Sequence, residues 1–452
     1  MFPIVTPPES QQQFRRVGPL DAVAEYLTDD EINDICRDIG HDWRDRQLTP
    51  GVTIRSCVQR ALNGDHSIAA MLADLAAANS PDVPVPTDSA WCQARSRLPL
   101  AVFRELIARR AHDCQDRFGA SYQWNGRPVF IVDGSSVSTP DEPALVDVFG
   151  YAPTRHGPSR FPVARITFIE IAGLEVIWDY RFDDYRTSED EQFEEMWPSI
   201  PDGCIILADK KFSSFHTLAK LRRRNIGVVT LLHQRRNPYK LIRQGRPLGP
   251  GEWIVYLNLA PQLRRRYDDP TLPERLPVRL IRVRFHRGGH RHVLWVVTTL
   301  MDQRRYPARP VAAAYRWRWD IEGRIGSLKT TLEMNVLRSK KPPSVRREVA
   351  AIILGHNLVW MLIHEAAESS EVPVEDISFA CAVKIAVAFS KTLPLLPAAQ
   401  RPAMRNKMLK LIAAHVNHHP FGRVEPRRIK RDRRRYPYLK EPRDLARAKC
   451  LT

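Results

Sequence analysis

Apolar side chains recur at helical spacing through the first quarter of the chain. The stretches DDEINDICRDIG, SCVQRALNG, SIAAMLADLAAAN and LPLAVFRELIARRAHDC each gather apolar positions on one face and polar positions on the other. This period of 3.6 residues is typical of short amphipathic helices. We therefore predict a helical N-terminal domain over residues 1–118.

From residue 127 the pattern changes to apolar runs that predict strands. Three runs, RPVFIVDG, FPVARITFIEIAGLEVIWDYRF and CIILAD, precede a helical stretch, FHTLAKLRRRN, and one more strand, IGVVTLL. Gly173 divides the longest run and predicts a hairpin turn. Strands interleaved with helices favour an α/β fold, and residues 119–232 are predicted to form the first part of its core.

The remaining residues divide into three further regions. Residues 233–299 are strand-like and interrupted by Pro and Gly, which predicts a β-rich insertion. Residues 300–345 would then supply the second part of the core. In residues 346–452 the apolar stretch VAAIILGHNLVWMLIHEAAE predicts a helix, and the chain continues into C-terminal helices and a basic tail.

One predicted helix, YRWRWDIEGRIGSLK, carries an ordered polar face. Tyr315, Arg318, Glu322 and Lys329 fall within about 60° of one another, because each helical residue advances about 100°. An adjacent apolar stripe can seat this helix on a core: Ile321, Ile325, Leu328 and Leu332. One interpretation is a solvated face with an ordinary ion pair. The other is an acid that holds a metal beside cations that hold phosphates.

The chain's charge favours a polyanionic partner. Its 452 residues, 43% of them hydrophobic, can bury a sizeable core. Lys and Arg number 69 against 51 Asp and Glu, a formal charge of +18, which favours nucleic acid, with acidic membrane surfaces as the alternative. Neither a signal-peptide pattern nor an unbroken run of about 20 apolar residues is found. We expect a cytoplasmic protein without a membrane partner.

Cysteine and histidine suggest no metal site. The seven cysteines contain no C-x-x-C pair, so reduced thiols are expected rather than a zinc site or a disulfide framework. Two histidine groups lie in basic or Gly-rich stretches without a carboxylate or thiolate set: His286, His290 and His292, and His415, His418 and His419. We disfavour a metal there.

Two upstream aspartates follow buried strands. Asp133 is predicted to end the strand VFIVD, and Asp209 ends CIILAD. An acid after a strand can simply start a turn. Neighbouring parallel strands, however, place their carboxyl ends together, where α/β sheets form their sites. Converging carboxylates favour Mg²⁺ or Mn²⁺, and two such ions about 4 Å apart promote phosphodiester chemistry.

These residues together resemble a known family. Asp133, Asp209 and Glu322, with the signature Tyr315-x2-Arg318-x3-Glu322-x6-Lys329, resemble a DDE transposase of the bacterial insertion sequence four family. The resemblance covers most of the chain, since it includes IVDGSSVSTPD, LTPGVTIRSCVQRALNGDHSIAAM, SAWCQARSRLP and GRVEPRRIKRDRRRYPYLKEPR. It implies an RNase H-like core, a mixed sheet flanked by helices, that a β-rich insertion interrupts before the glutamate.

The resemblance also implies roles for particular residues. Asp133, Asp209 and Glu322 match the catalytic carboxylates that bind two Mg²⁺ or Mn²⁺ ions. Three others, Tyr315, Arg318 and Lys329, match residues that contact the backbone of the transposon end.

Further DNA contacts are expected outside that signature. Trp295 resembles a tryptophan that stacks on a flipped base, although a strand-core aromatic is the alternative. Many relatives carry Arg-Gly-Phe after the second acid, and this chain has Lys210 and Lys211 there, before Phe212. The basic tail can contact phosphates or remain a solvated charge run. Its candidate residues are Arg427, Arg428, Lys430 and Arg431.

The implied function is cut-and-paste transposition. Cleavage at the terminal inverted repeats of double-stranded DNA is followed by strand transfer into target DNA, with a hairpin route and a homodimeric synaptic complex as in relatives. The N-terminal helices and the basic tail are candidates for recognition of the DNA end, and the DNA-bound protein is expected at the nucleoid. Two alternatives remain at this point: a nuclease or resolvase without strand transfer, and a non-catalytic DNA-binding derivative.

Overall fold

The computed structural model describes residues 21–417, apart from residues 45, 65–66, 78, 80–82, 156 and 288–289. The structure also does not describe the side chains of residues 287, 316, 319–322 and 324. Several residues singled out above are not described either: Arg427, Arg428, Lys430, Arg431, His418 and His419, and the same holds for one of the seven cysteines, Cys450.

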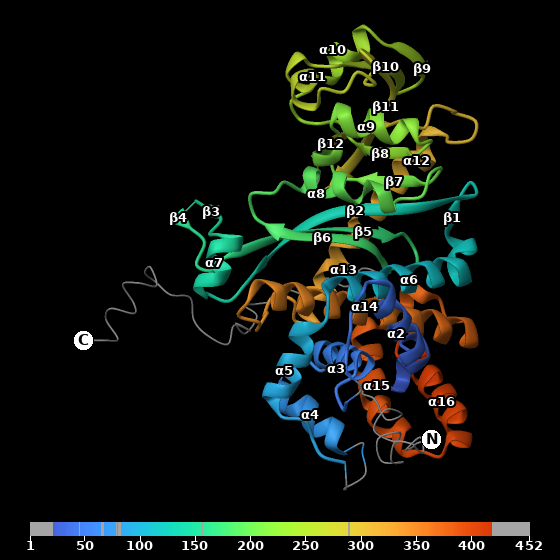
Figure 1. Cartoon of the computed structure of the whole chain (residues 1–452). Coiled ribbons are helices and arrows are strands. Elements are labelled where there is room, and N and C mark those ends of the chain that lie inside the picture. The colour runs from blue at the N-terminus through green and yellow to red at the C-terminus, as the bar shows by residue number, and fades with distance from the viewer. Residues whose placement is uncertain are drawn as a thin grey trace, which may run out of the picture.

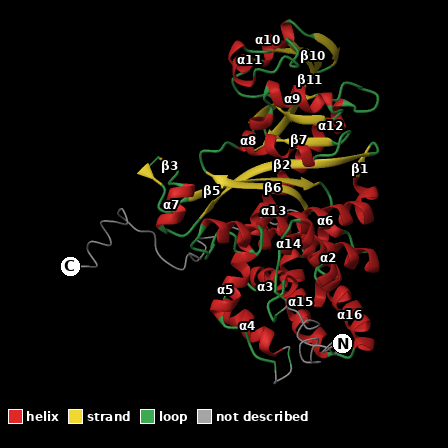
Figure 2. Ribbon diagram, viewed as in Figure 1, coloured by secondary structure: helices red, strands yellow, loops and turns green. Residues whose placement is uncertain are grey.

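The described residues form a ten-stranded mixed sheet, with helices on its faces and below it in the view of Figures 1 and 2. The strand order is β6-β5-β2-β7-β8-β12-β11-β10-β9, and β1 pairs with β2 outside this path. The core strands are β1 (Gln123–Trp124), β2 (Arg127–Ser138), β5 (Val163–Ile171), β6 (Ile177–Asp184), β7 (Ile205–Ala208) and β8 (Gly227–Leu231). A separate short hairpin consists of β3 (Pro153–Thr154) and β4 (Gly157–Pro158).

The core strands combine antiparallel and parallel pairing. β2, β5 and β6 form an antiparallel meander, whereas β7 and β8 run parallel to β2 on its other side. All four residues of β7 are buried, as expected for a parallel strand that helices cover on both faces. This order, with its flanking helices, confirms the predicted α/β, RNase H-like fold class.

The predicted hairpin at Gly173 is confirmed, because the turn joins β5 to β6. Gly173 has a φ of +83°, and a Cβ atom there would lie 2.2 Å from Cδ1 of Tyr122. Both observations require glycine at this position.

Residues 233–299 extend the same sheet. The strand of this region that pairs with the core is β12, which runs antiparallel to β8. The region's strands are β9 (Arg246–Gly249), β10 (Glu252–Asn258), β11 (Arg275–Arg287) and β12 (His290–Thr298), and its helices are α10 (Pro238–Arg243) and α11 (Pro261–Tyr267). In Figure 1 they lie at the end of the molecule opposite the large group of helices.

Buried Arg279 joins this region to the core. The side chain is fully buried, and its Nε donates to Oε1 of Glu252 at 2.8 Å. Its Nη1 donates to the carbonyls of Leu300 at 2.7 Å and Tyr306 at 2.9 Å, which follow β12 in the chain. A buried charge is tolerated when it is paired and hydrogen-bonded in this way, so Arg279 fixes the insertion to the chain that re-enters the core.

Short helices flank the core strands or connect them to the site: α7 (Pro143–Phe149), α8 (Glu189–Met196), α9 (Phe215–Arg223), α12 (Ala308–Ala314) and α13 (Arg318–Thr330). The lower group of helices combines both ends of the described chain. From the N-terminal side come η1 (Asp21–Tyr26), α2 (Asp29–Asp38), α3 (Pro50–Leu62), α4 (Ile68–Ala77), α5 (Asp88–Arg97) and α6 (Leu100–Phe118). From the C-terminal side come α14 (Pro342–Ser370), α15 (Phe379–Thr392) and α16 (Arg401–Ala414).

Helix α14 is the centre of this lower group. It is long and apolar enough to cross a membrane, but its apolar stretch is entirely buried within the described structure, as in the core helix of a globular protein. Asn357 on α14 accepts a hydrogen bond from the Ile177 amide and donates one to the Ile177 carbonyl, both at 2.8 Å. Because β6 is an edge strand, this pair satisfies backbone groups that would otherwise lack partners.

Candidate active site

Asp133 and Asp209 follow the last pair of residues that joins β2 to β7. That pair is Val132 with Ala208, and each of the two is followed directly by one of the aspartates. The prediction that the strand ends at Asp133 is wrong, because the other edge of β2 remains paired with β5 as far as Ser138. The parallel pairing, rather than the strand, ends here and brings the two acids next to each other.

The Asp133 carboxylate is partly buried and has few positive neighbours. Its Oδ1 accepts from the Gly134 amide at 2.8 Å, and its Oδ2 accepts from Nη1 of Arg318 at 3.2 Å. Burial raises the pKa of this carboxyl above its usual range. The Gly134 amide and Arg318 oppose that increase, whereas the Glu189 and Asp209 carboxylates add to it. The local field therefore favours an additional positive charge.

Asp209 connects the end of β7 to the 3-10 turn η4 (Lys210–Phe212). Its backbone is extended, and its side chain does not cap the turn. The backbone carbonyl instead accepts from Oγ1 of Thr230 on β8 at 3.0 Å, and Phe212 is fully buried. These two contacts fix the backbone of the turn, and among the described side chains none forms a hydrogen bond with the Asp209 carboxylate.

The polar helix is interrupted at its start. α12 leads into a 3-10 turn, η5 (Tyr315–Trp317), and α13 begins only at Arg318, so the predicted single helix from Tyr315 is wrong in its first turn. Tyr315 is only 2% exposed, and the Arg318 guanidinium lies 5.7 Å from its ring centre. Burial raises the pKa of Tyr315 to about 12, so the phenol keeps its proton at neutral pH.

Glu322 lies on α13, one turn beyond Arg318. Its backbone is described, whereas its side chain lies outside the described part, together with that of Ile321. The rest of the predicted apolar stripe is buried: Ile325, Leu328 and Leu332. Because α13 packs on β2, the stripe seats this helix against the strand that carries Asp133.

Lys329 reaches the same strand from the last turn of α13. Its Nζ donates to Oγ of Ser135 at 2.6 Å, and burial lowers the pKa of the amine. Ser135 is two residues after Asp133 in β2, and residues two apart in a strand point to the same face. Arg318 and Lys329 therefore place two cations along one face of β2.

Sequence reasoning missed the Glu189 carboxylate, which lies beside this face. Glu189 is the first residue of α8, and its side chain is 15% exposed. Nζ of Lys211 donates to its two oxygens at 3.2 and 3.3 Å. A Cβ atom on Gly134 would lie 2.5 Å from Cδ of Glu189, so glycine at this position makes room for the acid.

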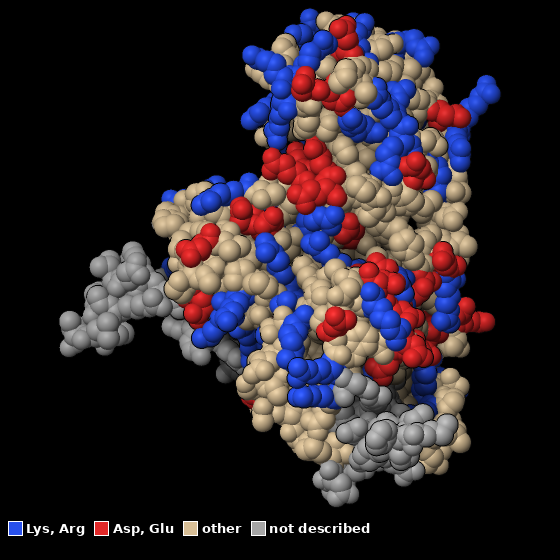
Figure 3. Space-filling view, viewed as in Figure 1, with Lys and Arg blue, Asp and Glu red and all other residues tan. Residues whose placement is uncertain are grey.

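Only the fold brings Glu189 to β2. The motif Ser188-x2-Glu191 signals the start of α8, because Ser188 and Glu191 form a capping box there. The sequence does not indicate that this helix start faces Gly134. Asp and Glu gather over α8 in Figure 3, which shows that the acids of this helix form a wider patch.

Trp295 lies on β12 in the insertion and is partly buried. Its ring is 6.1 Å from that of Trp253 and 5.8 Å from that of Tyr239. The register pairs Trp295 with Arg282, whose guanidinium lies 5.5 Å from the Trp253 ring centre. Trp295 therefore belongs to an aromatic cluster that also carries a cation, a combination that suits stacking on bases.

The predicted lack of a histidine metal site remains a prediction. His286, His290 and His292 are exposed on the β11–β12 hairpin. Within the described part of the chain, no three His, Cys, Asp or Glu side chains lie close enough to hold a metal ion. No cysteine of the described part forms a disulfide: Cys36, Cys57, Cys92, Cys114, Cys204 and Cys381.

The residues at the end of the β2–β7 pairing fit a divalent cation. Carboxylate oxygens are the ligands that Mg²⁺ and Mn²⁺ prefer. Asp133 lies near two further acids, Asp209 and Glu189, and burial and these acids together destabilise its charged form. A bound cation would offset that repulsion.

Two transposases are similar to this chain in sequence. Over 363 residues, 78% of each chain, the protein is 26% identical to the transposase InsG for insertion sequence element IS4 of Escherichia coli strain K12. It is 32% identical to the putative transposase InsZ of the same strain over 168 residues, which are 36% of this chain and 55% of that protein.

A solved structure also aligns along most of the chain. It is the cryo-EM structure of a piggyBac transposase synaptic complex with hairpin DNA, with 11% identity over 88% of this chain and 85% of that one. The TM-score of 0.42 is too low for this likeness to bear on the fold or the function.

The family assignment rests on a match to the transposase DDE domain. This family matches residues 124–358, which are more than half of the chain and include Asp133, Asp209 and Glu322. The likeness to InsG confirms the predicted resemblance to transposases of the insertion sequence four family. The chain belongs to the transposase DDE domain family.

Proposed function

We propose that Asp133, Asp209 and Glu322 are the catalytic carboxylates of this DNA transposase and hold two divalent ions, Mg²⁺ or Mn²⁺. The observation that carries the proposal is the end of parallel pairing between β2 and β7, where the two aspartates follow neighbouring strands and α13, the helix of Glu322, packs on β2. Ions bound there would activate the attacking hydroxyl and stabilise the leaving oxygen during cleavage and strand transfer.

The remaining side chains of the site bind the substrate's phosphates. Arg318 and Lys329 present cations on the face of β2 that carries Asp133. The Tyr315 phenol, protonated at neutral pH, lies beside the Arg318 guanidinium and accepts a hydrogen bond from it, which holds the cation in place. Charge-assisted hydrogen bonds of this kind hold a strand in place and stabilise the charge that develops on it.

Lys211 balances the acids before DNA binds. It is 61% exposed, and its ion pair with Glu189 lies at the border of the site. An incoming phosphate competes for this amine, and Lys210 beside it adds a second charge at the same turn. Trp295 of the insertion is proposed to stack on an unpaired base, because it belongs to an aromatic and cationic surface.

The partners follow from this chemistry. The substrates are the terminal inverted repeats of the element and the target DNA, both double-stranded. A homodimer that holds two ends, and excision through a hairpin, are part of the proposal, as is a cytoplasmic location at the nucleoid. The basic tail with Arg427, Arg428, Lys430 and Arg431 is proposed to contribute phosphate contacts.

The direct test is incubation with a duplex that carries the element's end, in the presence of Mg²⁺. The wild-type protein should yield nicked, hairpin and joined products. Glu322→Gln should cleave at least about 1,000-fold more slowly, because loss of one ligand disrupts charge stabilisation in the transition state. The variant should still shift the same duplex in a gel, since binding depends mainly on cations.

Asp147→Asn is the matched control, because Asp147 is an exposed acid on α7. It should cleave like the wild type. Unimpaired cleavage by Glu322→Gln would show that the acid is not catalytic. Nicking by the wild type without joined products would show that strand transfer has been lost.

A further inference from the structure

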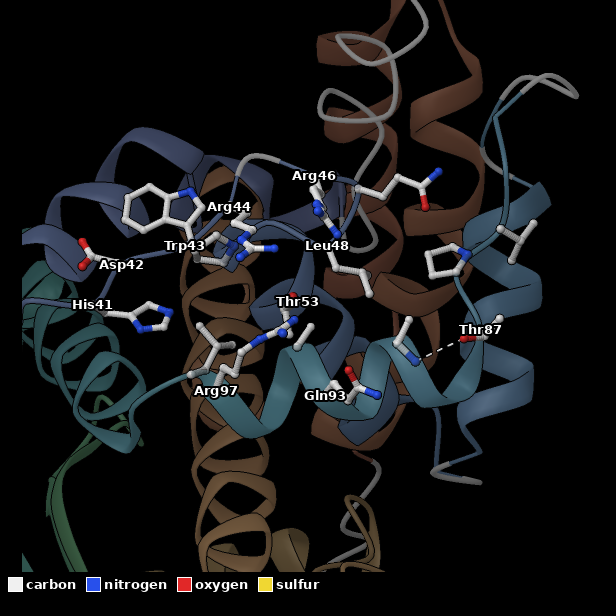
Figure 4. A pocket seen from close by; sticks show the side chains of 17 residues that line it. His41, Asp42, Trp43, Arg44, Arg46, Leu48, Thr53, Thr87, Gln93 and Arg97 are labelled. Carbon is white, nitrogen blue, oxygen red and sulfur yellow. Dashed lines mark hydrogen bonds between the residues drawn. The ribbon is translucent and has the colours of Figure 1, made fainter.

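A large hollow lies in the lower group of helices, on elements that the active site does not use. Its volume is about 1,040 Å³. One face of α5 forms the floor, through Ala90, Gln93, Ala94 and Arg97 at helical spacing, and residues 41–44 and 46–48, between α2 and α3, form the opposite wall (Figure 4). Sites that bind drug-sized ligands occupy about 300 to 1,000 Å³, so a nucleotide fits this space.

Among the described residues that line the hollow, cations outnumber acids. Arg44, Arg46 and Arg97 line it, and all three are exposed. No carboxylate of the described structure lies within ion-pair distance of these three guanidinium groups. Asp42 is the only acid among the described lining residues and lies at the edge beside His41 (Figure 4). The hollow therefore complements an anion.

Its walls are also apolar and aromatic. Trp43 lines the hollow, is only partly buried and stacks on His41 at 6.4 Å between ring centres. Leu48 and Pro86 add apolar surface to the lining. The small side chains of Ala90 and Ala94 keep the floor open. A cationic rim around an aromatic and apolar interior suits a ligand that carries both phosphates and flat rings.

We propose that this hollow binds an unpaired segment of a DNA strand, with its phosphates on Arg44, Arg46 and Arg97 and a base against Trp43. Proteins that bind single strands combine a cationic groove with aromatic side chains in the same way. A duplex keeps its bases stacked inside, so its backbone can use the arginines but not Trp43 or the apolar floor. Strand cleavage by the transposase supplies unpaired ends on which such a surface can act.

The test is fluorescence anisotropy of full-length protein with a labelled oligo(dT) strand, without metal and over a range of salt concentrations. The variant Arg44→Gln/Arg46→Gln/Arg97→Gln removes three charges. Each phosphate contact on a single strand contributes about 0.7 to the slope of log K against log salt, so the slope should fall by about 2. Affinity at moderate salt should fall on the order of 10- to 100-fold.

The matched control removes three exposed lysines from helices on the C-terminal side, as Lys384→Gln/Lys407→Gln/Lys410→Gln. Its loss of affinity should be several-fold smaller. Equal losses in the two triple variants would overturn the site, because only net charge would then matter. An equal loss for a labelled duplex and for oligo(dT) would also overturn it, in favour of a surface for the duplex backbone.

Variants of Trp43 test the contribution of base stacking to binding separately from that of the arginine charges. Trp43→Ala should weaken oligo(dT) binding about 5- to 100-fold, the range for loss of one base–aromatic stack. Trp43→Phe should restore much of that loss, and the binding of duplex should not change in either variant. Unchanged oligo(dT) binding by a folded Trp43→Ala protein, judged from its melting curve, would contradict the proposal. Because these measurements use no metal, they are independent of the catalytic assignment.

Discussion

The core and the insertion share one sheet but distribute charge in opposite ways. Around Asp133 the core gathers carboxylates, and burial raises the pKa of Asp133 and of nearby Asp190. Residues 233–299 instead contain 14 Lys or Arg against four acids, which gives +10 of the chain's formal +18. One of those four acids, Glu252, is already bound to buried Arg279. The core is thus suited to receive cations, and the insertion to receive phosphates.

The register of the insertion extends this contrast. Arg282, Arg284 and His286 alternate along β11, and they pair with Trp295, Val293 and Arg291 on β12. Residues that pair across two antiparallel strands point to the same face. Trp295 therefore shares a face with cations, in the same sheet that brings Asp133 and Asp209 together.

The largest effect is expected at Lys329, a cation on the face of β2 that carries Asp133. Lys329→Met should slow cleavage about 10- to 100-fold, because it removes a charge that holds a phosphate in the transition state. The measurement is single-turnover cleavage of the element's end at saturating protein. Lys340→Met is the control, because Lys340 is 74% exposed and pairs with Glu142 away from the site. Equal rates for both variants would place Lys329 outside the chemistry.

Substitutions in the insertion are expected to weaken DNA binding clearly and to change the rate of cleavage little. Arg284→Gln/Arg291→Gln should reduce the salt slope for duplex binding by about 2 and weaken affinity about 10-fold, because each phosphate contact contributes about 0.9. Cleavage of bound DNA should remain near the wild-type rate. The control pair is Arg264→Gln/Arg265→Gln on α11, and a similar loss in that pair would show that no particular face of the insertion is used.

The smallest effect concerns the stability of the core. Burial, with Glu194 and Glu189 nearby, raises the pKa of Asp190 to about 6. An acid whose pKa is raised in the folded state favours folding while it is protonated, and this contribution is lost as pH rises through that value. Asp190→Asn should therefore be more stable than wild type by about 1–2 kcal/mol at pH 8, and nearly equal to it at pH 4.

Thermal melting of Asp190→Asn at the two pH values tests this expectation. Asp147→Asn on α7 serves as the control and should show the same pH profile as wild type. A stabilisation of Asp190→Asn that does not change with pH would mean that charge is not its cause.

Much of the fold around the site could be predicted from the sequence, because short local patterns determine the strands and helices there. The apolar run before Asp209 fixes a buried strand, and the spacing of Ile325, Leu328 and Leu332 seats α13. Two features depend instead on contacts between distant residues. The continuation of β2 past Asp133 is set by its pairing with β5, and the position of Glu189 is set by the packing of α8. Neither is visible in a single stretch of sequence.

The central claim is that Asp133, Asp209 and Glu322 surround one metal site. Fe²⁺ in place of Mg²⁺, with ascorbate and hydrogen peroxide, cleaves a protein backbone close to the bound ion. We predict cuts near residues 133, 209 and 322 in the wild-type protein, and loss of all three in Asp133→Asn. Cuts confined to the hairpin of His286, His290 and His292, or an absence of cuts near residue 322, would contradict the claim.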